Sequence, residues 1–152
     1  MAFKEYRLTK EWPYHVSCGG VVYRSKDYEL EVMVLMRHDG SFDIPKGTLH
    51  VDETLQACAL REVEEESGQI AEIAGYLGSG LAEGVDKNSG AKISKATHYF
   101  ALKWIADTGS HDDEYNHIEW TTPQEAQSKL KASSGEIVGR LVDFIRLFPA
   151  HH

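Results

Sequence analysis

The sequence predicts an α/β (α+β) sandwich, and three observations support this fold class. Two strand-rich segments follow one another near the N-terminus, a helix with an apolar stripe occupies the middle of the chain, and two helical segments close it. The 152 residues are enough for one domain with a full core, so we expect residues 1–152 to form a single domain.

Four segments have the composition of β-strands. Residues 16–23 (VSCGGVVY) and 29–36 (ELEVMVLM) are rich in β-branched and long apolar residues, and a polar turn separates them. Residues 70–77 predict a third strand, and residues 96–105 (ATHYFALKWI) predict a fourth. Residues 81–93 between these two are rich in glycine and polar residues, which predicts a mobile loop placed to cover a substrate.

Three helices are expected, and their ends carry recognisable signals. The central helix should end at Gly68, where a left-handed cap is favoured. Residues 123–132 predict a short helix, with Thr122 as N-cap and proline at the first helical position. Residues 135–148 predict the last helix. Its apolar residues recur at helical spacing: Ile137, Leu141, Phe144, Ile145 and Phe148.

The central helix concentrates negative charge beside its apolar stripe. At 100° per residue, Glu62, Glu65 and Glu66 share one face, whereas Glu64 lies opposite and is expected in solvent. Like charges at these spacings destabilise a helix, and a divalent cation would offset the repulsion. Oxygen ligands without a supporting His or Cys set favour Mg²⁺, Mn²⁺ or Ca²⁺ over Zn²⁺. The neighbouring apolar stripe consists of Ala59, Leu60 and Val63.

Residues 47–69 (GTLHVDETLQACALREVEEESGQ) resemble the Nudix box. The box has Gly, five residues, Glu, seven residues, Arg-Glu, an aliphatic, any residue, Glu-Glu, any residue, Gly and an aliphatic. Gln69 departs from the final aliphatic position, and we expect Ile70 to fill that packing site. The matching residues are Gly47, Glu53, Arg61, Glu62, Val63, Glu65, Glu66 and Gly68.

The resemblance implies an α/β/α sandwich with a mixed β-sheet packed between helices. It implies hydrolysis of a nucleoside diphosphate linked to another moiety X, by water attack on phosphorus, with Mg²⁺ or Mn²⁺ as cofactor. It also implies that Arg61 and Glu53 pair and brace the loop and helix. The implied metal ligands are the Gly47 carbonyl and the carboxylates of Glu62, Glu65 and Glu66.

The general base is open, because Nudix enzymes use either a helix Glu or a Glu on a distal loop. The distal candidate is Glu114, six residues before Trp120, a spacing that resembles diadenosine tetraphosphate hydrolases of this family. Glu114 is therefore expected to be an auxiliary metal ligand or the base. Three other acids compete for this role: Asp112, Asp113 and Glu119.

Several residues outside the box are candidates for substrate binding. Lys46, in the segment FDIPKG, has two possible roles: contact with a substrate phosphate, or pairing with a box carboxylate. Arg37 and His38, at the end of the second strand, are possible phosphate contacts. Tyr115 is the best candidate for stacking on a base, because its neighbours are all polar. Core packing is the default expectation for the other three aromatic candidates, Tyr76, Tyr99 and Trp120.

Net charge, apolar runs and cysteine content limit the binding partners and the cellular location that we expect. The net charge of −8 makes nucleic acid an unlikely partner but allows a small-molecule nucleotide substrate, because bound metal would offset the local field. No apolar run approaches 18 residues and the N-terminal stretch has no apolar signal core, so we expect a cytoplasmic protein without a membrane span. We expect Cys18 and Cys58 to be reduced and buried, and the protein to be a monomer or homodimer.

The function expected from these features is metal-dependent pyrophosphohydrolysis of dinucleoside polyphosphates such as diadenosine tetraphosphate, as an asymmetrical bis(5'-nucleosyl)-tetraphosphatase. Four alternatives are nucleoside triphosphate, ADP-ribose or nucleotide-sugar, diphosphoinositol polyphosphate, and RNA 5'-end hydrolases, the last two disfavoured by the acidic composition. A nucleotide sensor without catalysis is a further alternative, which the presence of all three box carboxylates disfavours.

Overall fold

The computed structural model describes residues 14–86, 88–110 and 116–149. Glu114 and Tyr115, together with Asp112 and Asp113, lie outside the described residues. The elements in chain order are β1 (Tyr14–Lys26), β2 (Glu29–Met36), β3 (Phe42–Asp43), β4 (Lys46–Thr48), α2 (Leu55–Ser67), β5 (Gln69–Val85), β6 (Lys92–Asp107), β7 (His117–Thr121), α3 (Pro123–Lys129) and α4 (Ala132–Leu147).

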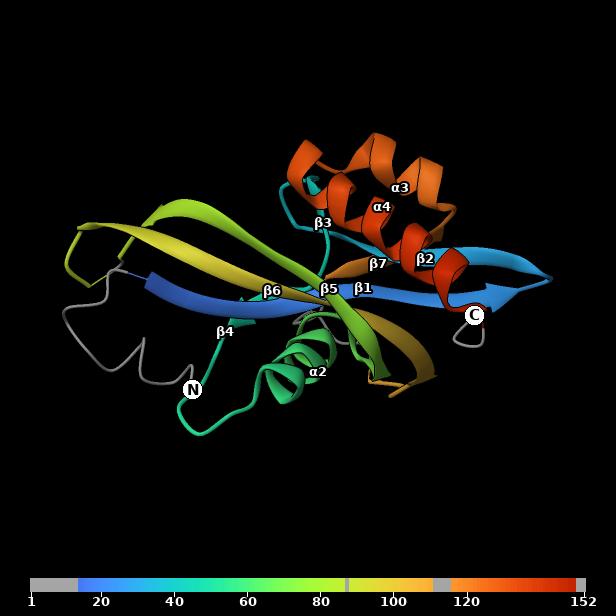
Figure 1. Cartoon of the computed structure of the whole chain (residues 1–152), viewed down its shortest axis with the longest axis horizontal. Helices are drawn as coiled ribbons and strands as arrows, with labels where there is room; N and C mark the ends of the chain where they lie inside the picture. The colour runs from blue at the N-terminus through green and yellow to red at the C-terminus, as the bar shows by residue number, and fades with distance from the viewer. Residues whose placement is uncertain (1–13, 87, 111–115, 150–152) are drawn as a thin grey trace.

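The described strands form one mixed sheet of seven strands. The main path runs β3-β2-β1-β6-β5, while β4 pairs with β1 and β7 pairs with β2. The β1–β6 pair is parallel, and the other pairs are antiparallel. Helix α2 covers one face of the sheet, and α3 and α4 cover the other (Figure 1). This arrangement confirms the predicted α/β/α sandwich.

The sheet separates two apolar cores, and the alternation of side chains along β2 shows how. Val32 and Val34 pack toward α3 and α4, whereas Met33 and Leu35 pack toward α2. All four side chains have no exposed surface. A strand buried on both faces reads as a continuous apolar run. This explains why the sequence of β2 shows no alternation of apolar and polar residues.

The predicted loop over residues 81–93 is wrong. Strand β5 continues to Val85 and β6 begins at Lys92, so most of this segment is paired backbone in a long hairpin arm (Figure 1). The turn is held by the Asp86 N–H, which donates to the Ala91 carbonyl at 2.8 Å. Glycine and polar residues weaken a strand locally, but backbone pairing between β5 and β6 outweighs that preference.

Other boundaries also differ from the predictions. Three strands have no counterpart in the predictions: β7, which pairs with β2, and the short strands β3 and β4. Helix α3 ends at Lys129 and α4 begins at Ala132, so the two predicted helices shift by three residues where they meet. None of the described helices has the length and apolarity needed to cross a membrane.

Gln69, the residue that departs from the box, itself fills the buried position expected for an aliphatic residue. Its side chain is 1% exposed, and its Oε1 accepts a hydrogen bond from Trp104 Nε1 at 2.8 Å. Its Nε2 donates to the Ser67 carbonyl at 3.4 Å. Ile70 is only half-buried, so the expectation that it fills this position is wrong. Strand alternation in β5 places residue 69 against the core, where these hydrogen bonds satisfy its amide.

Candidate active site

Helix α2 is fixed at both ends by the signals that its sequence carries. The Thr54 hydroxyl accepts a hydrogen bond from the Ala57 N–H at 3.0 Å, which caps the first turn. Gly68 has a φ of 71°, and its N–H donates to the Glu64 carbonyl at 2.8 Å. Ala59 and Val63 are fully buried against the sheet, and Glu64 is exposed, as predicted. The acidic edge of the helix is thereby held beside β4.

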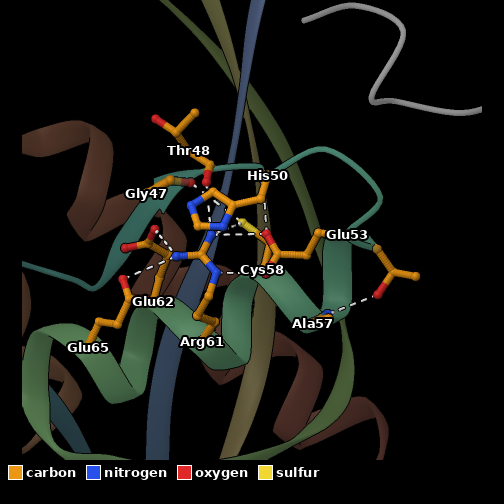
Figure 2. A network of polar contacts seen from close by, with 10 residues as sticks. Gly47, Thr48, His50, Glu53, Ala57, Cys58, Arg61, Glu62 and Glu65 are labelled. Carbon is orange, nitrogen blue, oxygen red and sulfur yellow. Dashed lines mark hydrogen bonds and ion pairs between the residues drawn. The ribbon is translucent and has the colours of Figure 1, made fainter.

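Arg61 lies at the centre of the site (Figure 2). Its Nε donates to Glu53 Oε2 at 2.6 Å and its Nη2 to Glu53 Oε1 at 2.9 Å, a two-point pairing that confirms the expected brace. Nη1 donates to Glu62 Oε1 at 2.8 Å and to Glu65 Oε2 at 3.1 Å. Nη2 also donates to the Thr48 carbonyl at 2.9 Å, so one guanidinium joins the loop, β4 and α2.

Each member of the Glu53–Arg61 pair stabilises the charged form of the other. The hydrogen bond from Arg61 lowers the pKa of Glu53 to about 2, and the N–H of His50, which donates at 3.0 Å, acts in the same direction. The same pairing raises the pKa of Arg61 above its ordinary value. The side chains of Arg61 and Glu53 are 20% and 13% exposed, so solvent screens this pair only partly.

Gly47 and Glu62 are in direct contact across the space between β4 and α2. A Cβ at residue 47 would lie 2.1–2.3 Å from the carboxylate atoms of Glu62, so only glycine leaves room for this carboxylate. Cys58 Sγ donates a weak hydrogen bond to the Gly47 carbonyl at 3.7 Å. Cys18 pairs with Gly47 in the β1–β4 register, and both cysteines are free and buried, as expected.

Glu66 is held by two donors, one from β4 and one just after β2. Its Oε1 accepts a hydrogen bond from the Lys46 N–H at 2.9 Å, and its Oε2 accepts one from Arg37 Nη1 at 3.3 Å. Burial raises the pKa of Glu66 above its ordinary value, although both donors act against the rise. Arg37, a possible phosphate contact, thus donates to a box carboxylate, and its contact with phosphate stays a prediction.

The box carboxylates are paired with arginines in this arrangement. Glu62 and Glu65 share Arg61, whereas Glu66 contacts Arg37, and no group of three or more His, Cys, Asp or Glu side chains among the described residues is arranged to hold a metal ion. The donor chemistry nevertheless fits Mg²⁺ or Mn²⁺, because it consists of carboxylate and carbonyl oxygens. The Glu62 carboxylate occupies the space that a Cβ at Gly47 would fill, so these two expected ligands lie close together.

Asp43, which lies outside the box, pairs with both Lys46 and Arg37. Lys46 Nζ lies 3.6 Å from Asp43 Oδ2, and Arg37 Nη2 lies 3.5 Å from the same oxygen. Burial disfavours the charged form of Asp43, yet its pKa is lowered because Lys46 and the Ile44 N–H act on its carboxylate. The Lys46 side chain therefore pairs with Asp43 instead of a box carboxylate, and its contact with a substrate phosphate stays a prediction.

The remaining candidate residues differ in burial and in their partners. His38 is exposed just after β2, and Glu119 in β7 is paired with Lys129 Nζ at 2.7 Å. The default of core packing is wrong for Tyr76, whose side chain is 52% exposed and whose hydroxyl lies 2.9 Å from His98 Nδ1. Tyr99 is buried. Trp120 packs beneath the Arg24 guanidinium, with 3.9 Å between its ring centroid and the guanidinium carbon.

Sequence reasoning missed a cavity of about 370 Å³ that adjoins the box at β4. No motif could have indicated it, because its residues come from five elements that are separated in the chain. The lining consists of Ser17, Lys46, Gly47, Thr48, Gly80, Leu81, Lys95, Thr97, Tyr99, Lys131, Ser133, Glu136, Ile137 and Arg140.

Comparison with known proteins places this site in a family. The NUDIX domain family matches residues 13–141, so the chain belongs to the NUDIX domain family of hydrolases. A protein of Mycobacterium tuberculosis (strain CDC 1551 / Oshkosh) assigned as a mutator protein, MutT4, is 26% identical over 110 residues. That match covers 67% of this chain and 42% of the relative, so the chain spans less than half of the relative's length.

Solved structures share the fold. The Ap4A hydrolase of C. elegans has a TM-score of 0.63 at 17% identity and covers 87% of this chain and 98% of its own. The dihydroneopterin triphosphate pyrophosphohydrolase of E. coli has a TM-score of 0.65 at 19% identity, with 86% and 98% covered. A MutT protein from Methanosarcina mazei Go1 has a TM-score of 0.67 at 22% identity, with 90% and 98% covered. At these identities the likeness concerns the fold alone.

Proposed function

We propose that this protein is a metal-dependent pyrophosphohydrolase that cleaves a phosphoanhydride bond in a nucleoside diphosphate linked to another moiety. The observation that supports this most directly is the joint placement of Gly47, Glu53, Arg61 and Glu62. Arg61 braces Glu53 and Glu62 within one hydrogen-bond network, and Glu62 occupies the space that only glycine at residue 47 leaves open.

The residues that would hold the metal are Gly47, through its carbonyl, and the carboxylates of Glu62, Glu65 and Glu66, with Mg²⁺ or Mn²⁺ as the cation. When bound, the cation would neutralise the non-bridging phosphate oxygens and position the attacking water. Arg61 and Glu53 would keep the loop and helix in register during turnover, because their two-point pairing restrains both elements.

Glu65 is the helix carboxylate best placed to accept the proton of the attacking water. Its side chain is 57% exposed, whereas those of Glu62 and Glu66 are 13% and 14% exposed. A base must reach water within hydrogen-bond distance, which favours the accessible carboxylate. Glu114, the distal candidate, retains its proposed role as auxiliary ligand or base on the strength of its spacing from Trp120.

Among substrates we favour dinucleoside polyphosphates such as diadenosine tetraphosphate, which would yield ATP and AMP. Two resemblances to diadenosine polyphosphate hydrolases support this choice: the segment FDIPKG before the box, and the spacing from Glu114 to Trp120. The cavity beside β4 has room for part of such a molecule. Lys46 reaches the cavity and the box together, since it lines the former and its N–H donates to Glu66.

A substrate panel with metal and with chelator tests this proposal. The panel holds diadenosine tetraphosphate, nucleoside triphosphates, ADP-ribose, nucleotide sugars and triphosphorylated RNA. We expect Mg²⁺-dependent release of ATP and AMP from diadenosine tetraphosphate, abolished by chelator. Faster turnover of another compound would overturn the substrate choice. Binding without turnover of any compound would overturn the enzyme and favour a nucleotide sensor.

A pair of neighbouring variants separates catalysis from charge. Glu65→Gln should lower kcat by roughly 10²–10⁴-fold, because Glu65 is the proposed acceptor of the proton from the attacking water. Glu64→Gln removes the same charge from the exposed opposite face of α2 and should leave kcat unchanged. Equal rates for the two variants would remove Glu65 from the proposed mechanism.

A further inference from the structure

The cavity beside the box is cationic within an acidic protein. Lys46, Lys95, Lys131 and Arg140 line it, and Glu136 is the one carboxylate among the described lining residues. The chain as a whole carries a net charge of −8. Two of its lining residues, Tyr99 and Ile137, belong to the core on the sheet face that α3 and α4 cover, whereas α2 covers the opposite face (Figure 1). The charge of the cavity is therefore a local reversal next to the proposed reaction site.

Arg140 is held in place by backbone carbonyls of β5. Its Nη1 donates to the Leu77 carbonyl at 3.2 Å and to the Ser79 carbonyl at 3.5 Å, and its Nη2 donates to Glu136 Oε1 at 3.3 Å. Gly78, between these carbonyls, has a φ of 100°, and a Cβ there would lie 2.9 Å from Nη1. The irregularity of β5 at this glycine thus fixes a guanidinium at the cavity wall.

Lys95 and Lys131 have no carboxylate within ion-pair distance among the residues that the structure describes. The cavity also offers little aromatic surface. Tyr99 is the one aromatic residue among the described lining residues, and it is only 9% exposed. Stacking on a base requires an exposed ring, whereas several converging cations favour an anion. The lining therefore recognises negative charge in preference to a nucleobase or an uncharged sugar.

We infer that Lys95, Lys131 and Arg140 bind phosphate groups that lie beyond the phosphoanhydride bond cleaved at the box. This inference rests on the proposed function and narrows its substrate class. Substrates must carry at least one further phosphate, as diadenosine tetraphosphate and nucleoside triphosphates do. ADP-ribose and nucleotide sugars, whose moiety beyond the diphosphate lacks phosphate, offer no further anion to Lys95 and Lys131. The three residues determine specificity through charge, and they take no part in the bond-breaking step.

Binding of inorganic tripolyphosphate in the presence of chelator tests the inference without turnover. Calorimetric titration compares the wild type with Lys95→Gln/Lys131→Gln and with Lys92→Gln, a control on the same strand whose side chain does not line the cavity. The double variant should bind about 10- to 100-fold more weakly, the usual effect of losing hydrogen bonds to charged groups. The control should bind as the wild type does. Equal affinity in all three proteins, or no wild-type binding, would overturn the inference.

A kinetic comparison distinguishes this inference from the proposed function. Diadenosine tetraphosphate and diadenosine diphosphate share both nucleosides and differ in the additional phosphates. The ratio of their kcat/KM values should favour the tetraphosphate in the wild type and fall about tenfold or more in the double variant. An unchanged ratio with intact hydrolysis would overturn the phosphate site alone. Absent hydrolysis with tripolyphosphate binding lost only in the double variant would overturn the proposed function alone.

Discussion

At the scale of single residues, Arg61 is the cation that pairs with three carboxylates of the site. One guanidinium donates hydrogen bonds to three carboxylates and to the Thr48 carbonyl. Its positive charge offsets the repulsion that Glu62 and Glu65 would otherwise exert on one another. Because Arg61 remains protonated at any physiological pH, the strength of this network depends on the ionisation of its carboxylate partners.

The pKa of Glu53 predicts how stability depends on pH. Its folded pKa of about 2 lies below its ordinary value of 4.5, so its charge stabilises the fold above pH 4.5, and this contribution is lost as pH falls toward 2. Glu53→Gln should lower the free energy of unfolding by about 2 kcal/mol at pH 7. Urea unfolding should show the difference from wild type shrinking below pH 4.5. Glu64→Gln is the exposed control, and a pH-independent difference would contradict this account.

The contact between Gly47 and Glu62 predicts a variant with intact fold and reduced activity. Gly47→Ala places a methyl group where the Glu62 carboxylate now lies, and that flexible side chain can move aside. We expect the free energy of unfolding to change by less than about 1 kcal/mol, because only a side-chain end is displaced. The kcat/KM should fall by about 10- to 100-fold, since a misplaced group near the reacting centre costs this much. An undiminished kcat/KM would show that Glu62 acts elsewhere.

At the scale of elements, local caps fix both ends of α2. Thr54 closes the start, Gly68 closes the end, and Ala59 and Val63 bury the inner face. The caps and the buried inner face thereby fix the position of the acidic residues on the edge of α2. Strand β4 is only three residues long, but its pairing with β1 fixes Gly47 beside that edge.

Two glycine-to-alanine changes should have opposite effects on stability. Gly68→Ala places a Cβ in the left-handed conformation at a φ of 71° and should cost about 1 kcal/mol. Gly135→Ala lies within α4, where the nearest atoms to the new Cβ are 3.7 Å away, and should stabilise by about 0.5–1 kcal/mol. Thermal and urea unfolding measure both changes. Destabilisation by Gly135→Ala as large as that by Gly68→Ala would contradict the cap assignment.

At the scale of the whole molecule, the mixed sheet places two chemistries on its opposite faces. Helix α2 presents carboxylates from one face, and the cationic cavity opens on the face covered by α4. Lys46 contacts both regions through β4. A substrate that crosses this edge would meet the proposed metal ligands on one side and the cations on the other. The acidic surface elsewhere on the chain would not compete for that substrate.

Metal binding should stabilise the whole fold. A ligand that binds the native state alone adds about 2.7 kcal/mol at 100 times its Kd. We therefore expect Mg²⁺ to raise the Tm of the wild type and chelator to reverse the rise. In Glu62→Gln the rise should be smaller, because a proposed ligand is lost, whereas Glu64→Gln should behave as the wild type. A Tm that is independent of metal in differential scanning calorimetry would contradict the proposed ligand set.

The parts of the fold that could be predicted from the sequence are those set by local interactions. The caps at Gly68 and Thr122 and the pairing of Glu53 with Arg61 join residues no more than eight positions apart, and the box itself lies within residues 47–69. Helical periodicity and capping depend on such short separations. The class of the fold and its family follow from these features.

Tertiary structure decided what depends on pairing between distant segments. The β5–β6 arm replaces the predicted loop because backbone pairing between strands outweighs local glycine content. Gln69 is buried because Trp104, 35 residues away, satisfies its amide. The cationic cavity exists only where β1, β4, β5, β6 and α4 meet. The sequence by itself determined the family, because its motif is local in the chain, whereas the proposed phosphate-binding charges are brought together only by the folded sheet.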